Sequence, residues 1–370
     1  MMSVVCGGYS GHDSVALCRI PVPRLEHNHQ VGREKCEYFR LMTIVIDCVE
    51  DFQLDKKLAF YRIFCLQVLV RVMSAGLDRT DLLAVSGWGR VERGKPHGGF
   101  TIGRDFCGVV LEAGRGAGHV HPGDRVWGAT PYPAPGTLSE QVVVPGGCLT
   151  TMPTNLNWEG GATVPHSALA VWAALVTPGL LRPDQAAGAR VLVLDGVTDT
   201  GVIATQLCCL WGGHVTVLTS PRAAQLAAAL GAHTVIPISD SAEDTESRVA
   251  RAGPYNLIVQ CGDSVPVSPA WLTPATRTAS TLPPARLSSD GWGGLRRALH
   301  PAWRALVSAP RVAACPDVSA CLSYVRDAVQ RGKLQPVLDT VLAPQQVGAA
   351  LQKLAAQEVV GKSIVLFDKL

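Results

Sequence analysis

Hydrophobic and polar positions follow the period of strands in the first half of the chain. Residues 66–72 read LQVLVRV, an alternation typical of a half-buried strand. Three more short strands, separated by turns that contain glycine or proline, are expected at 106–112, 125–129 and 140–144. From about residue 41 to 145 the pattern therefore predicts a partly open β-barrel.

Strands and helices alternate in the second half. After a ten-residue helix at 167–176 (SALAVWAALV), strands are expected at 191–194, 214–218, 234–238 and 255–260, with helices at 201–211 and 222–230. This alternation predicts a parallel sheet with right-handed crossovers. The proline-rich stretch 262–310 has no clear strand pattern. After it, a helix at 318–329, a strand at 337–342, a helix at 345–356 and a strand at 363–367 are expected.

Composition narrows the class of protein. The chain has 370 residues, enough for two domains, and 47% of them are hydrophobic against 17% charged, which excludes intrinsic disorder. Lys and Arg number 33 and Asp and Glu 30, and no long basic run gathers this small surplus, so no nucleic-acid partner is expected. Two charge-poor stretches, 160–181 and 200–221, are interrupted by proline or glycine, so no transmembrane segment is expected.

The cysteines do not indicate a metal or redox site, and the N-terminal segment does not look like a typical leader. The 12 cysteines include no CxxC pair, so neither a zinc ribbon nor a dithiol redox site is predicted. We interpret most of them as small buried side chains in a reducing compartment. Residues 1–40 are expected to be irregular. Their mixture of arginines with acidic residues is unlike a mitochondrial leader, which is poor in acidic residues.

Six short motifs occur in one order along the chain. They are GRDFCGVV (103–110), HPGDRVWGA (121–129), GTLSEQVVVP (136–145), RVLVLDG (190–196), LGAHTVI (230–236) and GKSIVLF (361–367). In this order they resemble the medium-chain dehydrogenase/reductase superfamily, in particular its quinone oxidoreductase branch and, most nearly, the mitochondrial reticulon-4-interacting oxidoreductases. The likeness covers roughly residues 65–370, with a gap in the proline-rich stretch.

The resemblance implies an α/β fold in which a GroES-like, partly open β-barrel domain joins a Rossmann domain with a doubly wound parallel sheet. It divides the chain into an irregular leader (1–40), a GroES-like catalytic domain (41–160), a Rossmann NAD(P)-binding domain (161–315) and a C-terminal helix and strands (316–370) that return to the catalytic domain. It also implies NADPH-dependent reduction of a quinone or conjugated carbonyl compound (an enone) between the two domains. The implied location is mitochondrial, and a homodimer is left open.

Zinc is not expected as a cofactor. Zinc-dependent members place a cysteine near the position of Asp78 and a histidine in a GHE motif where this chain reads GRD at 103–105, and the sequence has no four-cysteine structural lobe. The Arg and Asp of GRD are interpreted first as a structural ion pair or turn and only second as catalytic. Asp78, Asp81 and Trp88 lie where the family lines its pocket, and Trp88 is equally compatible with a core position.

The loop after the first strand of the second half is the expected cofactor loop, and it has few glycines. Relatives read roughly GASGGVG where this chain reads DGVTDTG at 195–201. A dinucleotide fold uses glycines here so that the backbone can approach the pyrophosphate. Asp199 brings a carboxylate toward the phosphates, and two unit charges about 5 Å apart at an effective dielectric near 20 repel by roughly 3 kcal/mol, about a hundredfold in affinity.

Other positions argue for and against a cofactor. Ser220 and Arg222 follow the second strand, where a hydroxyl and a guanidinium can bind the 2′-phosphate of NADPH, although a solvated arginine is an equal alternative. Ala170, Ile238 and Cys261 stand where relatives carry other residues. The predicted cofactor-binding residues are Val197, Thr198, Asp199, Thr200, Gly201, Ser220, Arg222 and Cys261.

Two functions are therefore carried forward. The preferred one is an active, zinc-independent, NADPH-dependent reductase of a quinone or enone. The alternative is a degenerate family member with weak or lost cofactor binding that acts as a binding or scaffolding protein. The unusual N-terminal segment and the proline-rich region also leave open an imperfect gene model.

Overall fold

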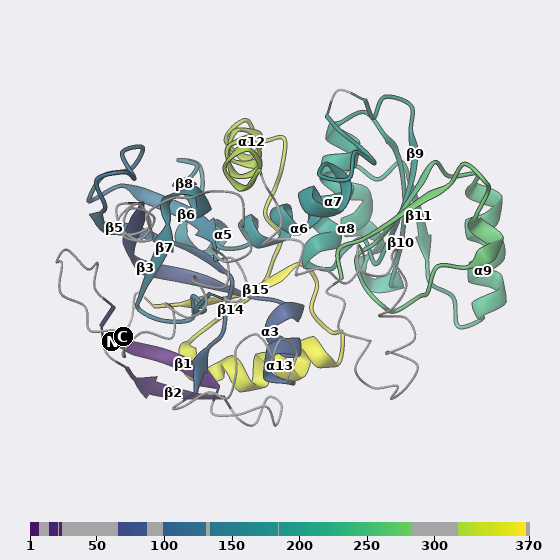
Figure 1. Ribbon diagram of the computed structural model, residues 1–370. Coiled ribbons are helices and arrows are strands. Elements are labelled where there is room, and N and C mark those ends of the chain that lie inside the picture. Colours follow the sequence, from purple (N-terminus) through teal and green to yellow (C-terminus); the bar gives the residue numbers. More distant parts are fainter. Residues whose placement is uncertain are drawn as a thin grey trace, which may run out of the picture.

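The computed structural model describes residues 1–6, 15–20, 22–23, 66–86, 99–130, 134–183, 185–282 and 317–367. These residues form two parts, which are joined by buried helices (Figure 1). We call the part built on the mainly antiparallel seven-stranded sheet the first body, and the part built on the five-stranded parallel sheet with its helices the second body. The predicted α/β fold is confirmed. Trp88 and most of the proline-rich stretch lie outside the described residues.

The first body is built on a seven-stranded sheet. Its order is β14-β15-β3-β5-β6-β8, and β7 pairs with β3. The strands are β3 (Gln67–Leu77), β5 (Asp105–Ala113), β6 (Arg125–Ala129), β7 (Gln141–Pro145), β8 (Leu149–Thr151), β14 (Leu338–Leu342) and β15 (Lys362–Leu366). Each strand expected from the alternation is present. β3 is nevertheless buried on both faces except near Arg71, because it is a central strand with partners on either side.

A small second sheet takes two of its three strands from the segment that was expected to be irregular. β1 (Met2–Cys6) pairs with β2 (Val15–Arg19) and β4 (Phe100–Thr101). The Val4 amide donates to the Leu138 carbonyl at 2.8 Å, and the Val4 side chain is 1% exposed. The expectation of an irregular start is wrong for these strands, because the buried apolar run MSVVC completes the barrel core.

This burial gives a direct test. Val4→Ala is expected to lower the free energy of unfolding by about 2 kcal/mol, because it removes two methyl groups from a packed site. Val22→Ala, at a position 47% exposed, is the matched control and should change stability very little. Urea denaturation of both variants measures the difference. Equal stabilities would show that β1 is not part of the core.

The second body is a five-stranded parallel sheet. Its order is β11-β10-β9-β12-β13, as a doubly wound fold requires. The strands are β9 (Arg190–Leu194), β10 (His214–Thr219), β11 (Thr234–Pro237), β12 (Leu257–Gln260) and β13 (Arg277–Ser280). The helices are α7 (Asp199–Leu210), α8 (Ala224–Ala229) and α9 (Ala242–Ala252).

Two of these elements were not expected from the sequence. β13 lies in the stretch that was said to lack a strand pattern, so that expectation is wrong there. α9 (AEDTESRVARA) buries only Thr245 and Val249 and therefore shows no wide apolar stripe. Its N-terminal signal is Ser241, whose side chain accepts from the Asp244 amide.

The two bodies are joined by helices and by the end of the chain. Every residue of α6 (Pro165–Leu175) is buried, and α6 packs on α7 and on α12 (Val318–Gln330) (Figure 1). β15 pairs antiparallel with the end of β3, with Ser363 opposite Leu77. This pairing brings Lys362 next to Asp78, and both lie at the junction of the bodies. The four-part division of the chain stays a prediction.

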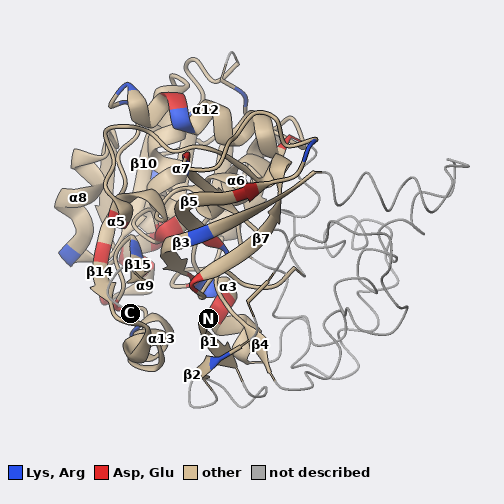
Figure 2. Ribbon diagram, turned by 90° about the vertical axis from the view of Figure 1, so that its left-hand side faces the viewer, with Lys and Arg blue, Asp and Glu red and all other residues tan. Residues whose placement is uncertain are grey.

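Short helices and 3-10 turns connect the strands and the longer helices. They are α3 (Arg79–Val85), α5 (Trp158–Gly161), α13 (Val347–Ala355), and single 3-10 turns at Gly146–Cys148, Pro221–Ala223, Pro269–Trp271 and Pro344–Gln346. Within the described ranges no helix combines the length and the apolar character needed to cross a bilayer. Figure 2 shows acidic and basic positions scattered over both bodies without a basic stripe in this view.

Candidate functional site

A cavity of about 90 Å³ lies at the carboxyl ends of β9, β10 and β12. In doubly wound sheets this edge is where ligands bind. Six of the predicted cofactor residues line it: Val197, Thr198, Asp199, Ser220, Arg222 and Cys261. The first body closes it with Leu77, Asp78 and Arg79. Thr200 and Gly201 lie directly behind it in the first turn of α7.

Two glycines follow β9, Gly196 in the loop and Gly201 in the first turn of α7, and Gly201 is required there for a steric reason. A Cβ on Gly201 would lie 2.2 Å from the Asp195 carbonyl oxygen, so the helix can approach the loop only with glycine there. The Gly201 amide is capped by the Thr198 hydroxyl at 3.1 Å. The start of α7 is therefore packed tightly against the loop, although the loop has fewer glycines than the GASGGVG of relatives.

Asp195 takes over part of the role of a glycine in this loop. Its φ of 56° lies in the left-handed region that few residues other than glycine adopt. Its carboxylate accepts from the Ser264 amide at 3.1 Å and so ties the loop to the segment after β12. Burial raises the pKa of Asp195, and the bonds from Ser264 lower it in part.

Asp199 has a cationic partner that the sequence did not reveal. Its carboxylate lies 4.0 Å from the Lys362 Nζ atom, and the Asp199 side chain is only 16% exposed. Burial raises the pKa of Asp199, while the Lys362 charge lowers it. The Lys362 charge therefore offsets part of the repulsion expected between Asp199 and a phosphate, and the hundredfold penalty stays a prediction.

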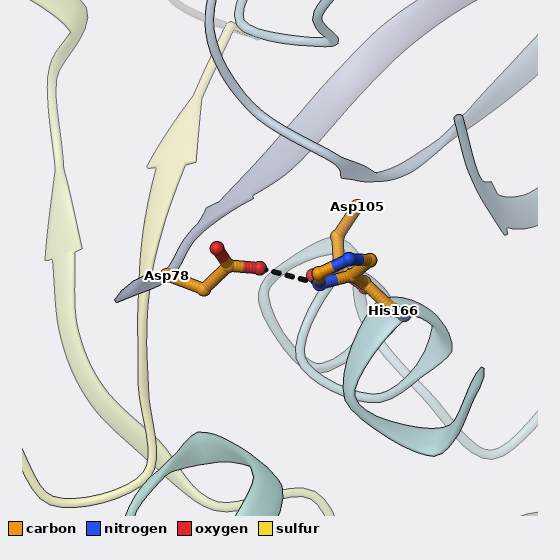
Figure 3. Close-up of side chains that lie close together, drawn as sticks. All are labelled: Asp78, Asp105 and His166. Atoms are coloured by element: carbon orange, nitrogen blue, oxygen red, sulfur yellow. Dashed lines mark hydrogen bonds and ion pairs between the residues drawn. The ribbon is translucent and has the colours of Figure 1, made fainter. Parts of the chain in front are cut away.

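Lys362 is the centre of a buried ion cluster, which we define as Lys362, Asp78, Asp105, His166 and Asp199. Its ammonium bonds to Asp105 and lies 3.7 Å from Asp78 Oδ2. His166 Nδ1 lies 2.6 Å from the same oxygen (Figure 3). The His166 amide donates to Asp105 Oδ1 at 2.6 Å. Four elements from both bodies thus meet in one cluster.

The charges in the cluster stabilise one another. Burial alone would raise the pKa of Asp78, but His166 and Lys362 together hold it well below its usual range. Burial would lower the pKa values of His166 and Lys362, yet the neighbouring carboxylates raise both. At Asp105 burial outweighs the Lys362 charge and raises the pKa. His166 and Lys362 therefore carry positive charge around an ionised Asp78.

Comparisons with known proteins agree with this geometry. Residues 66–154 match the alcohol dehydrogenase GroES-like domain. The mitochondrial NAD(P)H oxidoreductase RTN4IP1 of Danio rerio is 29% identical over 332 residues, which cover 81% of this chain and 83% of that one. Its Homo sapiens counterpart is 29% identical over 325 residues, 81% of each chain. By these matches the chain resembles the medium-chain dehydrogenase/reductase superfamily.

Solved structures show the same fold. The quinone oxidoreductase from Coxiella burnetii superposes with a TM-score of 0.67 at 17% identity and covers 99% of each chain. At this identity the match establishes the architecture alone. The chain is thus similar in sequence to proteins named NAD(P)H oxidoreductases, and it shares the fold of the solved structure.

One ligand atom from each of Asp78, Asp105 and His166 lies within 4.8 Å of the others, which is close enough for one metal ion to contact all three. The ammonium of Lys362 already bonds to Asp105 and lies 3.7 Å from Asp78. A divalent ion at this point would face a fixed positive charge at short range. The three side chains Asp78, Asp105 and His166 therefore do not fit a metal ion unless the Lys362 side chain moves away.

Sequence reasoning placed Asp81 in the pocket, but the structure places it in the cap of α3. Its side chain accepts from the Asp78 and Gly103 amides at 3.1 and 2.6 Å, and it is not among the cavity-lining residues. Burial and the nearby Asp78 charge raise the pKa of Asp81 to about 7. This carboxyl group has a structural role.

The raised pKa of Asp81 predicts a pH dependence of stability. The folded protein retains a proton that the unfolded chain loses above about pH 4, so stability present at low pH declines as the pH rises toward 7. Asp81→Asn cannot ionise and should reduce the loss between pH 5 and 8 by about 2 kcal/mol. Urea denaturation across this range tests it, with Asp124→Asn as the exposed control. An unchanged pH profile would contradict the assignment.

The partners within the ion cluster were not predicted from the sequence. Asp105 was interpreted as one half of an ion pair or turn within GRD, but its partner is Lys362, and the Arg104 Nη1 atom donates instead to the Ala134 carbonyl at 2.9 Å. Each of the two cations could have been noticed as an unusual position. Lys362 is a charged residue at the start of a buried strand, and His166 is a histidine in a helix that is buried throughout.

Proposed function

We propose that this protein is a zinc-independent, NADPH-dependent oxidoreductase that reduces a quinone or conjugated carbonyl compound. One observation carries the proposal: six of the cofactor-binding residues predicted from the sequence line a single cavity at the carboxyl edge of the parallel sheet, between the two bodies. The names of the relatives support the cofactor class.

The residues present fit an NADPH molecule at this edge. Ser220 and Arg222, at the end of β10, would hold the 2′-phosphate. Thr198 and the N-terminus of α7 would face the pyrophosphate, where Gly201 allows close approach and Lys362 offsets the Asp199 charge. When bound, the cofactor supplies a hydride to the substrate.

Reduction also consumes a proton, and the ion cluster holds one beside the cavity. His166 carries it on Nδ1 against Asp78 Oδ2, and Asp78 lines the cavity. We propose that this pair returns a proton to the substrate oxygen or carbon after hydride transfer. His166 and, to a smaller extent, Lys362 keep Asp78 ionised. The Lys362 ammonium lies 3.7 Å from Asp78 Oδ2, where a metal ion would be repelled, and this supports zinc independence.

A second candidate function is a degenerate member that binds partners without turnover. The size of the cavity favours it, because about 90 Å³ is below the roughly 300 Å³ or more of typical ligand pockets. Consumption of NADPH with a panel of quinones and enones separates the two candidates. Saturable turnover supports the reductase, and an absence of turnover with every substrate would favour the alternative.

We also propose where the protein is located in the cell and how its chains assemble. Because the relatives are named as mitochondrial proteins, we propose a mitochondrial location, which fractionation of cells expressing a tagged chain would test. A homodimer is proposed from the family resemblance, and light scattering of the purified protein measures it.

A further inference from the structure

The segment between α13 and β15, residues 357–361 (QEVVG), runs along the cavity, and we call it the strap. Gln357, Val359, Val360 and Gly361 all line the cavity. At its end the Gly361 amide donates to the Val197 carbonyl of the cofactor loop at 2.8 Å. The Val360 amide donates to Asp339 Oδ1 at 3.0 Å. The strap is thus attached to the loop that the cofactor must reach.

The other end of the strap occupies Arg222. An Nη atom of Arg222 donates to the Gln357 carbonyl at 3.0 Å. Gln357 holds a φ of 58°, a left-handed conformation that is uncommon for a residue other than glycine and needs support from its contacts. The guanidinium that would receive the 2′-phosphate is therefore already bound to the chain itself.

Asp263 supplies that support. Its Oδ1 atom accepts from Gln357 Nε2 at 3.1 Å and from Arg79 of the first body at 2.5 Å. Next to it, the Ser264 hydroxyl donates to Gln357 Oε1 at 3.1 Å. Asp263 and Ser264 thus hold the Gln357 side chain in place, and with it the carbonyl that faces Arg222.

We propose that the strap competes with the 2′-phosphate of NADPH for Arg222, and that Asp263, by holding Gln357, sets the preference between NADPH and NADH. This inference rests on the proposed function. A phosphate forms stronger, charge-assisted bonds to a guanidinium than a peptide carbonyl does, so NADPH displaces the strap. NADH has no 2′-phosphate and leaves that contact in place, so weakening the strap should favour NADPH selectively.

Two variants loosen the strap in different ways. Asp263→Asn removes the charge that holds Gln357 and Arg79. Gln357→Gly deletes the side-chain anchors but retains the left-handed turn, which glycine adopts without strain. Glu358→Gln is the matched control, because it removes one exposed carboxylate from the strap itself. Each dissociation constant is measured by calorimetry for NADPH and NADH separately.

Both loosening variants are expected to bind NADPH about tenfold more tightly, with NADH affinity rising less than about threefold and the control unchanged. The gain in NADPH affinity has to be compared with the gain in NADH affinity, because Asp263→Asn also frees Arg79, which would attract the pyrophosphate of either cofactor. An equal gain for both cofactors, or no gain, would overturn the inference while leaving the proposed function intact.

Amide hydrogen exchange gives a readout that needs no turnover. In the wild-type protein, NADPH should speed exchange at Val360 and Gly361 more than NADH does, because the strap is displaced. Slower or unchanged exchange with bound NADPH would contradict the displacement. If wild-type protein and variants bind neither nucleotide, the proposed function fails and this inference fails with it.

Discussion

Lys362→Met is expected to reduce the free energy of unfolding by about 3–5 kcal/mol, the largest single effect in the molecule. The ammonium is 1% exposed and bonds to Asp105, with Asp78 and Asp199 3.7 and 4.0 Å away. Its removal leaves buried carboxylates without their cation, and breaking a buried ion pair from one side costs this much. Chemical denaturation measures the loss.

Two further variants keep this prediction testable if Lys362→Met fails to fold. Lys362→Arg retains the charge and should recover part of the stability. Lys362→Met combined with Asp105→Asn removes both halves of the buried pair and should also be more stable than the single variant. Lys333→Met is the exposed control. If Lys362→Met were as stable as Lys333→Met, the cluster would not carry the stability assigned to it.

Gly201→Ala is expected to have the second largest effect, on both stability and NADPH affinity. The new Cβ would lie 2.2 Å from the Asp195 carbonyl oxygen and 2.8 Å from the Gly196 carbonyl carbon. Both are backbone atoms, so α7 must move away from the loop. We expect a loss of about 3 kcal/mol in stability and of more than about tenfold in NADPH affinity, because the α7 amides shift from the pyrophosphate position.

Gly118→Ala is the matched control for this variant. A Cβ on Gly118 meets nothing within 4 Å, so its stability and affinity should stay close to those of the wild type. Denaturation and NADPH titration of the two variants side by side measure the effect. A Gly201→Ala protein with wild-type stability would show that the close approach of α7 to the loop is unimportant.

Local patterns in the sequence predicted much of the fold. The apolar run at 191–194 became β9, and SALAVWAALV became the buried helix α6. Such runs determine their own structure, because strand and helix periods can be counted along the chain. α9 was missed because it is mostly polar and buries only two residues, so no run of apolar residues marks it in the sequence. β1 pairs with the nearby β2 and also with the distant β4, and the sequence pattern showed neither pairing.

The site was predicted in part. The residues of the cofactor loop could be placed because a strand followed by a helix fixes where the loop lies. The positive charge next to Asp199 could not be predicted, because Lys362 comes close to Asp199 only through the pairing of β15 with β3. Asp81 was assigned to the pocket because the sequence does not show which side of the α3 cap its carboxylate faces.

The central claim is that the cavity at the carboxyl edge of the parallel sheet binds NADPH through Arg222. Calorimetric titration of the wild-type protein and of Arg222→Gln with NADPH and NADH tests it most directly. The account predicts saturable NADPH binding that weakens by about tenfold or more in Arg222→Gln, with NADH affinity unchanged. No heat of binding in the wild type, or equal NADPH affinity in both proteins, would contradict it.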